Sequence, residues 1–380
     1  MPTYSPGVQS YIDQGAALTQ AEATQRAIMR GKKFDTIAVH GLYNMEAALA
    51  NNGSIIEPAY FSTAQHFENS DHMEAGLAYL MPAWTYSRVA NPTVHYLEET
   101  LALLEGYGFE DEVTACATGS GMSAVFLATN PFLAVDSAST APVNIVASVK
   151  CYGGTFTLFS RYANERGIEV RWVRDPLNVE EWAGKIDRQT RFLFGEMPAN
   201  PSLAMFDIAT LANLAHLHGI PFIVDSTIAT PVLTRPLLYG ADIVIHSVSK
   251  SMTSSGFVIA GVVIARHNIP SRVGPDELQA NFALYLKGFP LRDHGPSLSP
   301  FNALMTISDL RTLRSRTDLM SKNALRVAQF LARHPQVESV QYPGLPEFEG
   351  YDLAERYMWL VDSEDDYGKP VNRFCLPAQF

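Results

Sequence analysis

The chain has 380 residues, of which 47% are hydrophobic and 18% are charged, and its formal net charge is −11. These values are typical of a soluble globular protein of two or three domains and argue against a disordered chain. The acidic charge also argues against a nucleic acid or an anionic membrane as partner. The cysteines Cys116, Cys151 and Cys375 are too few and too scattered for a disulfide framework or a zinc cluster. We therefore expect no metal site and a reducing, cytoplasmic location.

Residues 1–88 are expected to form an N-terminal arm and subunit-contact segment. Residues 1–17 have no periodicity and predict a loose arm, whereas residues 18–30 are rich in Ala, Gln and Glu and predict a helix that ends at Gly31. Residues 34–60 mix short apolar pieces with Asn-Asn-Gly and predict an extended loop.

A second helix is predicted to start at Asn91 and Pro92, because asparagine is a favoured cap and proline suits the first turn. Apolar residues follow at helical spacing and stop near Gly106. Tyr86 and Arg88 lie in the loop before this helix. Taken alone, they are typical of surface packing.

Residues 89–298 alternate between strand and helix patterns and are expected to form one large domain. The predicted strands are 113–117, 144–149, 169–173, 192–196, 222–225, 243–246 and 258–264. Residues 207–218 have the apolar stripe of a helix, with Asp207 as its cap. Such alternation predicts an α/β fold with a mostly parallel sheet covered by helices on both faces.

The alternation of strand and helix patterns stops at about residue 298, and residues 299–380 predict a smaller α+β domain. Residues 300–316 and 322–333 have helical patterns, and residues 337–342 have a strand pattern.

Two of the predicted strands end in residues that can do chemistry. Asp225 ends one strand, and Lys250 follows the next one. Ligand groups bind beyond the carboxyl ends of parallel strands, so both side chains are expected in one crevice. An amine and a carboxylate suit an aldehyde cofactor with a ring nitrogen, because the amine bonds the aldehyde and the acid holds the protonated ring. Taken alone, the pair is equally typical of a strand-end acid and a solvated lysine.

The stretch from Gly119 to Ala124 matches G-x-G-x-x-A between a strand and a helix, which is formally a dinucleotide fingerprint. Backbone N–H groups at such a helix start bind any phosphate. A nicotinamide cofactor would require an acid at the end of the next strand, but that strand is followed by Lys150, Cys151 and Tyr152. The sequence therefore argues against a dehydrogenase.

Together these residues predict one site for a phosphorylated aromatic aldehyde. The expected phosphate contacts are Gly121, Met122, Ser247 and Ser249. Tyr152 is expected to stack on the ring, Asp225 to pair with the ring nitrogen and Lys250 to bond the aldehyde. An amine freed from that bond can move protons.

Several ordered motifs carry a family resemblance. They are Tyr86-Ser87-Arg88, Asn91-Pro92-Thr93, Ser120-Gly121-Met122, Tyr152-Gly153-Gly154-Thr155, Glu196-Met197-Pro198-Ala199-Asn200-Pro201, Val224-Asp225-Ser226-Thr227 and His246-Ser247-Val248-Ser249-Lys250. Over roughly residues 34–345 the chain resembles the Cys/Met-metabolism family of pyridoxal-phosphate (PLP) enzymes. The resemblance implies fold type I and a homotetramer of tight dimers with shared active sites. It also implies that Lys250 bonds PLP, that Tyr86 and Arg88 reach the phosphate of the neighbouring subunit, and that Asn200 lies near the 3-hydroxyl.

Within the family, the spacer at residues 72–79 and the stretches 291–303 and 312–316 resemble the O-acetylhomoserine sulfhydrylase branch. That branch implies γ-replacement on a small amino-acid substrate, O-acetyl- or O-succinyl-homoserine, with sulfide or a thiol, and Lys250 and Tyr152 as the residues that move protons. A γ-lyase acting on methionine or cystathionine is the alternative. It resembles this chain less, because Gly154 stands where methionine γ-lyase has a reactive cysteine.

Two departures from the family pattern affect the expected activity. The family usually has a Gly-His pair after the lysine, where this chain has Ser254 and Ser255. The C-terminal domain is short relative to the family, and neither Arg373 nor another late arginine lies in the motif that binds the substrate carboxylate. A PLP-binding subunit that needs a separate chain for the missing part is therefore a third possibility.

Overall fold

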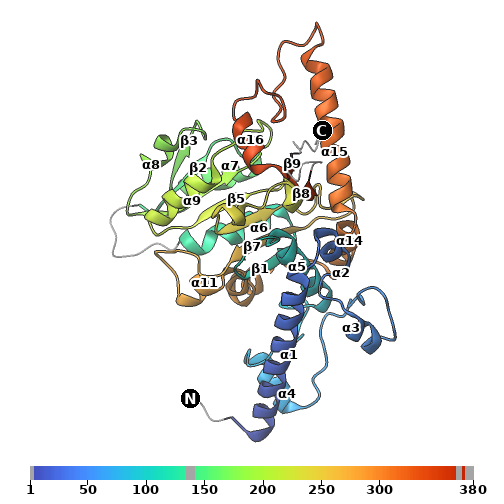
Figure 1. The fold of residues 1–380 in the computed structure, drawn as a ribbon. Helices are drawn as coiled ribbons and strands as arrows, with labels where there is room; N and C mark the ends of the chain where they lie inside the picture. The colour runs from blue at the N-terminus through green and yellow to red at the C-terminus, as the bar shows by residue number, and fades with distance from the viewer. Residues whose placement is uncertain (1–3, 134–141, 365–369, 373–380) are drawn as a thin grey trace.

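The computed structural model describes residues 4–133, 142–364 and 370–372, and its centre is a seven-stranded sheet (Figure 1). The strands are β1 (Val113–Thr118), β2 (Asn144–Ser148), β3 (Glu169–Val173), β4 (Thr190–Glu196), β5 (Phe222–Asp225), β6 (Ile243–His246) and β7 (Gly261–Arg266). Their order is β1-β7-β6-β5-β4-β2-β3. All neighbours are parallel except β7, which is antiparallel to both β1 and β6. The predicted mostly parallel sheet is confirmed.

Helices cover both faces of this sheet, as the strand pattern predicted (Figure 1). One apolar core contains residues of α5 (Pro92–Glu105), α9 (Ile208–Leu217) and α14 (Pro300–Leu310). The other contains residues of α6 (Gly121–Thr129), α7 (Gly153–Arg166) and α12 (Phe282–Leu286). The shorter elements are η1 (Asn130–Leu133), α8 (Val179–Ala183), α10 (Thr230–Leu233), η2 (Pro236–Tyr239), α11 (Asp276–Ala280), the π-helical turn η3 (Lys287–Leu291) and α13 (Arg292–His294).

The predicted helix starts of this domain are confirmed. Asn91 accepts the N–H of Thr93 at 2.9 Å and so caps α5. Asp207 accepts the N–H of Thr210 at 3.1 Å and caps α9. These caps satisfy donors that have no partner within the first turn of a helix.

The N-terminal region is more helical than its sequence pattern predicted. Helix α1 (Pro6–Arg30) extends through most of the predicted loose arm. Ser5 accepts the N–H of Val8 at 3.2 Å, and Pro6 occupies the first turn. The helix shows no apolar stripe because few of its residues are buried, which is why periodicity did not reveal it.

The predicted extended loop at residues 34–60 is also wrong in part. It contains α2 (Phe34–His40) and α3 (Met45–Ala50), and α4 (Ser70–Leu77) follows and packs against α1. Asn44 caps α3 by accepting the N–H of Ala47 at 2.8 Å. Helices of six to eight residues are too short for their periodicity to be recognised in the sequence.

The C-terminal region contains α15 (Leu313–Ala332), α16 (Tyr351–Tyr357) and a hairpin of β8 (Trp359–Glu364) and β9 (Pro370–Asn372). The helix predicted at 300–316 is two helices, α14 and the start of α15, and the second predicted helix is the remainder of α15. The strand predicted at 337–342 is absent from the described residues, and the strand of this region is β8 instead. Arg373 and Cys375 lie outside the described residues. Within the described ranges, no helix combines the length and hydropathy needed to cross a membrane.

Candidate active site

The candidate site lies where the parallel strands end. Asp225 is the last residue of β5 and is buried, with 7% of its surface exposed. Lys250 lies in the turn after β6, where its N–H donates to Ser247 O at 3.1 Å, and it is exposed. Because β5 and β6 are adjacent and parallel, both residues leave the sheet at the same edge.

Thr227 connects these two strand ends. Its N–H and hydroxyl donate to Asp225 Oδ1 at 3.0 and 2.6 Å, and its hydroxyl oxygen accepts the N–H of Ser247 at 2.8 Å. Neither hydrogen bond uses Asp225 Oδ2. Asp225 Oδ2 is therefore left for another partner, and Ser247 is held next to Thr227.

Gly121 brings the first turn of α6 against Ser247. A Cβ on Gly121 would lie 2.6 Å from Ser247 Cβ, so only glycine permits this approach. Ser120 accepts the N–H of Ser123 at 3.1 Å, but the first-turn N–H groups of Gly121 and Met122 have no acceptor within the helix. Free N–H groups beside a serine hydroxyl form a cradle for an anion.

Tyr152 and Met122 lie on the neighbouring side of this cradle. A Cβ on Gly154 would lie 2.5 Å from Tyr152 Cε1 and 3.1 Å from Met122 Sδ, so both side chains lie close to Gly154. The Tyr152 ring is 48% exposed. Its exposed surface is available to stack on a flat ligand.

Glu196 joins Tyr152 to Asn200. Its carboxylate accepts the N–H of Tyr152 through Oε2 and the N–H of Asn200 through Oε1, the latter at 2.8 Å. Glu196 ends β4 and is the registered neighbour of Asp225 on β5. Burial and the Asp225 charge raise the pKa of Glu196 to about 8. Burial also raises the pKa of Asp225, whereas the hydrogen bonds from Thr227 favour its ionised form.

Ser249 is engaged in closing the loop that follows Lys250. Its hydroxyl donates to Ala260 O at 3.0 Å and accepts the N–H of Ala260 at 2.9 Å. Further along this loop, Ser254 donates its N–H and its hydroxyl to Asp309 at 2.8 and 2.6 Å. Arg316 donates to the carbonyl oxygens of the loop residues Ser251, Met252 and Thr253.

The comparison with known protein families identifies this arrangement. A family model for the Cys/Met metabolism PLP-dependent enzymes matches residues 35–361. The chain belongs to this family. The resemblance inferred from the ordered motifs is therefore confirmed.

Individual family members support the same conclusion. The chain is 35% identical over 345 residues to an O-acetyl-L-homoserine sulfhydrylase of Corynebacterium glutamicum, an alignment that covers 85% of this chain and 76% of that protein. It is also 35% identical over 329 residues to an L-methionine gamma-lyase of Pseudomonas deceptionensis, covering 86% and 75%. A Campylobacter jejuni structure that contains N′-pyridoxyl-lysine-5′-monophosphate has a TM-score of 0.77 at 32% identity, covering 86% of this chain and 82% of that one. The predicted fold class is confirmed by this match.

Tyr86 and Arg88 of this PLP-family chain contact each other and the segment at Arg292. Arg88 donates to Arg292 O, and its guanidinium lies 5.5 Å from the centroid of the Tyr86 ring. None of their hydrogen bonds or ring contacts within the described chain goes to the residues around Asp225. Both side chains are exposed.

Two residues of the site, Glu196 and Thr227, were missed as candidates although both lie in the quoted motifs. Thr227 follows Asp225 by two residues, the spacing at which a hydroxyl can bond back to an aspartate, and this spacing was a usable signal. No sequence pattern placed Glu196 beside Asp225, because that contact depends on the register between β4 and β5.

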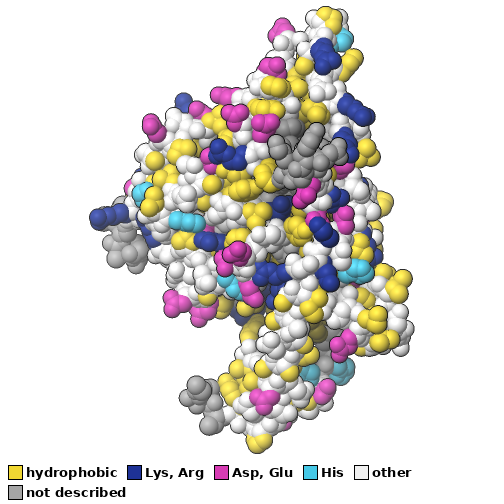
Figure 2. Space-filling model, in the orientation of Figure 1, with side chains coloured by type: hydrophobic (Ala, Val, Ile, Leu, Met, Phe, Trp, Pro, Cys, Tyr) yellow, Lys and Arg dark blue, Asp and Glu magenta, His cyan; other side chains and the backbone are white. Residues whose placement is uncertain are grey.

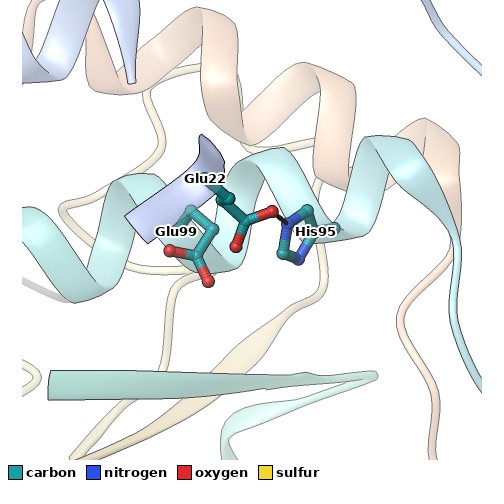
Figure 3. Close-up of side chains that lie close together, drawn as sticks. All are labelled: Glu22, His95 and Glu99. Atoms are coloured by element: carbon teal, nitrogen blue, oxygen red, sulfur yellow. Dashed lines mark hydrogen bonds and ion pairs between the residues drawn. The ribbon is translucent and has the colours of Figure 1, made fainter. Parts of the chain in front are cut away.

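One group of possible metal ligands lies outside the PLP-family site. Figure 3 shows the Glu22 carboxylate reaching the His95 ring, with Glu99 beside them, and the Glu22–His95 distance is 2.9 Å. Arg26 binds both carboxylates, at 2.9 Å to Glu22 and 2.7 Å to Glu99. The Arg26 guanidinium offsets one of the two negative charges of this group, and His95 bonds Glu22, so we interpret the group as an ion-pair network that connects α1 to α5.

Proposed function

We propose that this chain catalyses a PLP-dependent γ-replacement in which sulfide or a thiol displaces the acyloxy group of O-acetyl- or O-succinyl-homoserine. The observation that carries the proposal is the connected set of contacts joining Asp225, Thr227, Ser247 and Gly121 at the strand ends, with Lys250 in the next turn. Relatives named O-acetyl-L-homoserine sulfhydrylase and O-succinylhomoserine sulfhydrylase, each 35% identical, support the reaction class.

The residues present fit each part of the cofactor. The first-turn N–H groups of Gly121 and Met122, together with the Ser247 hydroxyl beside them, suit the phosphate. Asp225 Oδ2 suits the protonated ring nitrogen, and the exposed face of Tyr152 suits stacking on the ring. We place Asn200 near the 3-hydroxyl, and Ser249 next to the phosphate as the residue that closes the loop.

Each catalytic role then follows from position. When bound, PLP supplies an electron-accepting ring that stabilises negative charge at the substrate α-carbon. Asp225 holds the proton on the ring nitrogen. Lys250 Nζ would hold PLP through its aldehyde and would move the proton at the substrate Cα, while Tyr152 would assist proton transfer at Cβ. The carbon–oxygen bond at Cγ breaks, the acyl group leaves as a carboxylate, and the sulfur nucleophile bonds Cγ with loss of its proton.

We further propose that the sites are shared between subunits of a homo-oligomer, a dimer of dimers in the cytoplasm. Tyr86 and Arg88 are exposed, and among the described residues none of their hydrogen bonds or ring contacts goes to the cradle, which supports a role at the phosphate of a neighbouring copy. The surrounding N-terminal region has large exposed apolar side chains, with Met45 at 79% and Leu49 at 72% exposure, and Figure 2 shows apolar side chains gathered over α3. Exposed apolar groups of this kind are typical of subunit contacts.

The test is turnover by the purified chain loaded with PLP. We expect an absorbance band from the cofactor bonded to the protein, and homocysteine from O-acetylhomoserine only when sulfide is added. Lys250→Ala should lose the band, whereas Lys322→Ala, a change at a lysine on α15, should keep it. Absence of the band in the unmodified chain would refute the proposal.

The γ-lyase alternative is measured in the same assay, because a lyase releases a 2-oxo acid and ammonia without any thiol. Gly154 stands where the lyase pattern has its cysteine, and a Cβ there would lie 2.5 Å from Tyr152 Cε1, so a cysteine at this position would require the Tyr152 side chain to shift. Full turnover by this chain alone would also exclude the need for a separate partner chain.

A further inference from the structure

The buried carboxyl group of Glu196 has no role in the γ-replacement described above, yet it contacts the site from two directions. It accepts the backbone N–H of Tyr152 and that of Asn200, two residues from different loops. It thereby sets the distance between the residue proposed to stack on the ring and the residue proposed to lie near the 3-hydroxyl. Only 4% of the surface of Glu196 is exposed, so water does not replace these contacts.

The same group lies beside Asp225. The two residues are registered partners on adjacent parallel strands, so their side chains project from the same face of the sheet. Met197, which follows Glu196, also donates its N–H to Asp225 O at 3.0 Å. Two carboxyl groups held this close in a buried site cannot both ionise readily.

The other titratable groups around this pair favour a charge on Asp225 rather than on Glu196. Cys151 faces both carboxyl groups from the loop after β2, and burial raises the pKa of its thiol to about 12, so it stays neutral. His246 on β6 lowers the pKa of Asp225, and its ring nitrogens lie 2.8 Å from Glu105 Oε2 and 3.1 Å from Ser226 O. The pKa of Glu196 is instead raised by burial and by the Asp225 charge.

We propose that Glu196 is a positioning residue of the cofactor site, which holds Tyr152 and Asn200 in place and shares one negative charge with Asp225. This inference rests on the proposed PLP function. Below the range in which it ionises, Glu196 is neutral and leaves the negative charge to Asp225. Burial raises the pKa of Glu196 to about 8, and its ionisation adds a second negative charge beside the bound ring.

The sign of the pH effect follows from this charge. A protonated ring bound at Asp225 favours the ionised form of Glu196, so ring binding lowers the pKa of Glu196 and releases a proton. Linkage then requires that the contribution of Glu196 to binding increase as the pH rises towards 8. A glutamine at this position cannot ionise and cannot accept both N–H groups through oxygen.

The experiment measures the dissociation constant of pyridoxine 5′-phosphate between pH 6 and pH 8.5 for the cofactor-free full chain. This probe has no aldehyde, so it does not react with Lys250, and the comparison does not depend on turnover. We expect Glu196→Gln to bind about tenfold more weakly than the unmodified chain at pH 8, with a smaller difference at pH 6. Glu181→Gln is the matched control, because Glu181 also accepts two backbone N–H groups, those of Arg174 and Asp175 at 3.0 Å, but on α8 away from the site. We expect it to bind like the unmodified chain.

The results distinguish a failure of the proposed function from a failure of the positioning role of Glu196. If the unmodified chain binds no probe, the proposed function fails and the inference fails with it. If the unmodified chain binds but Glu196→Gln matches Glu181→Gln at every pH, or differs by a factor that is constant with pH, the inference alone is overturned. Should Glu196→Gln fail to fold, Glu196→Asp decides the question. The aspartate keeps the carboxyl group but shortens the side chain, so Glu196→Asp should bind pyridoxine 5′-phosphate more weakly at every pH. Binding equal to that of the unmodified chain would refute the positioning role.

Discussion

Replacing Gly121 with alanine tests whether the close approach of α6 to Ser247 builds the anion cradle. The new Cβ would lie 2.6 Å from Ser247 Cβ and 2.7 Å from its Oγ, distances that force one of the two segments to move. Overpacking of this kind costs about 1–3 kcal/mol. Alanine regains up to about 1 kcal/mol over glycine within a helix. We therefore expect a net loss of up to about 2 kcal/mol and, for a chain of 380 residues, a melting temperature lower by up to about 3 °C.

Gly153→Ala provides the control for this prediction. Gly153 is the first residue of α7, as Gly121 is of α6, but a Cβ added to Gly153 would meet no atom within 4 Å beyond its own helix and chain neighbours. Thermal unfolding of the cofactor-free chain and titration with PLP should both be measured. Gly121→Ala should bind PLP about tenfold more weakly, by loss of a charge-assisted contact to the phosphate. Gly153→Ala should match the unmodified chain in both assays, and equal behaviour of the two variants would refute the cradle.

Three further predictions concern other parts of the molecule. If a neighbouring copy supplies Arg88, the Arg88→Ala and Lys250→Ala chains should each be inactive alone. When equal amounts of the two are refolded together, about one quarter of the active sites should recover, because a mixed dimer has one intact site. No recovery of activity would contradict shared sites. Arg26→Ala should leave the buried Glu99 without its partner and lower the free energy of unfolding by about 1–3 kcal/mol. Proteolytic cleavage within α1 should then be faster. Cleavage at the rate of the unmodified chain would count against the ion-pair network. Because burial raises the pKa of Glu196 from 4.5 to about 8, the stability that it contributes to the cofactor-free chain is complete below pH 4.5 and is lost as the pH rises to about 8. Denaturant titrations should show this loss in the unmodified chain and a flatter profile in Glu196→Gln.

The sheet could be predicted from the sequence because most of its strands are short apolar runs, and β5 and β6 each end in a polar residue. Asp225 and Lys250 were placed at one edge by topology alone, since adjacent parallel strands end together. The caps Asn91 and Asp207 also marked helix starts correctly, because capping is a local interaction.

The remaining features depend on contacts between distant parts of the chain. Helix α1 has few buried residues and is held by individual polar contacts, such as the Tyr11 hydroxyl donating to Glu68 at 2.8 Å, so no periodic pattern indicated it. The role of Glu196 depends on the register of β4 against β5, which sequence spacing does not report. Residues 337–342 have a strand pattern but no partner strand among the described residues, because the hairpin of this region uses β8 and β9.

The direction of β7 has a consequence for how this enzyme family can vary. Since β7 runs opposite to β6, the chain leaves the sheet after His246 and re-enters it at Gly261 on the same side. Hydrogen bonds between Ser249 and Ala260 join the two ends of the loop between β6 and β7. Insertions, deletions or substitutions within this loop leave the strand register unchanged. The segment after the lysine, which contains Ser254 and Ser255, can therefore change in length and sequence without a change in the sheet.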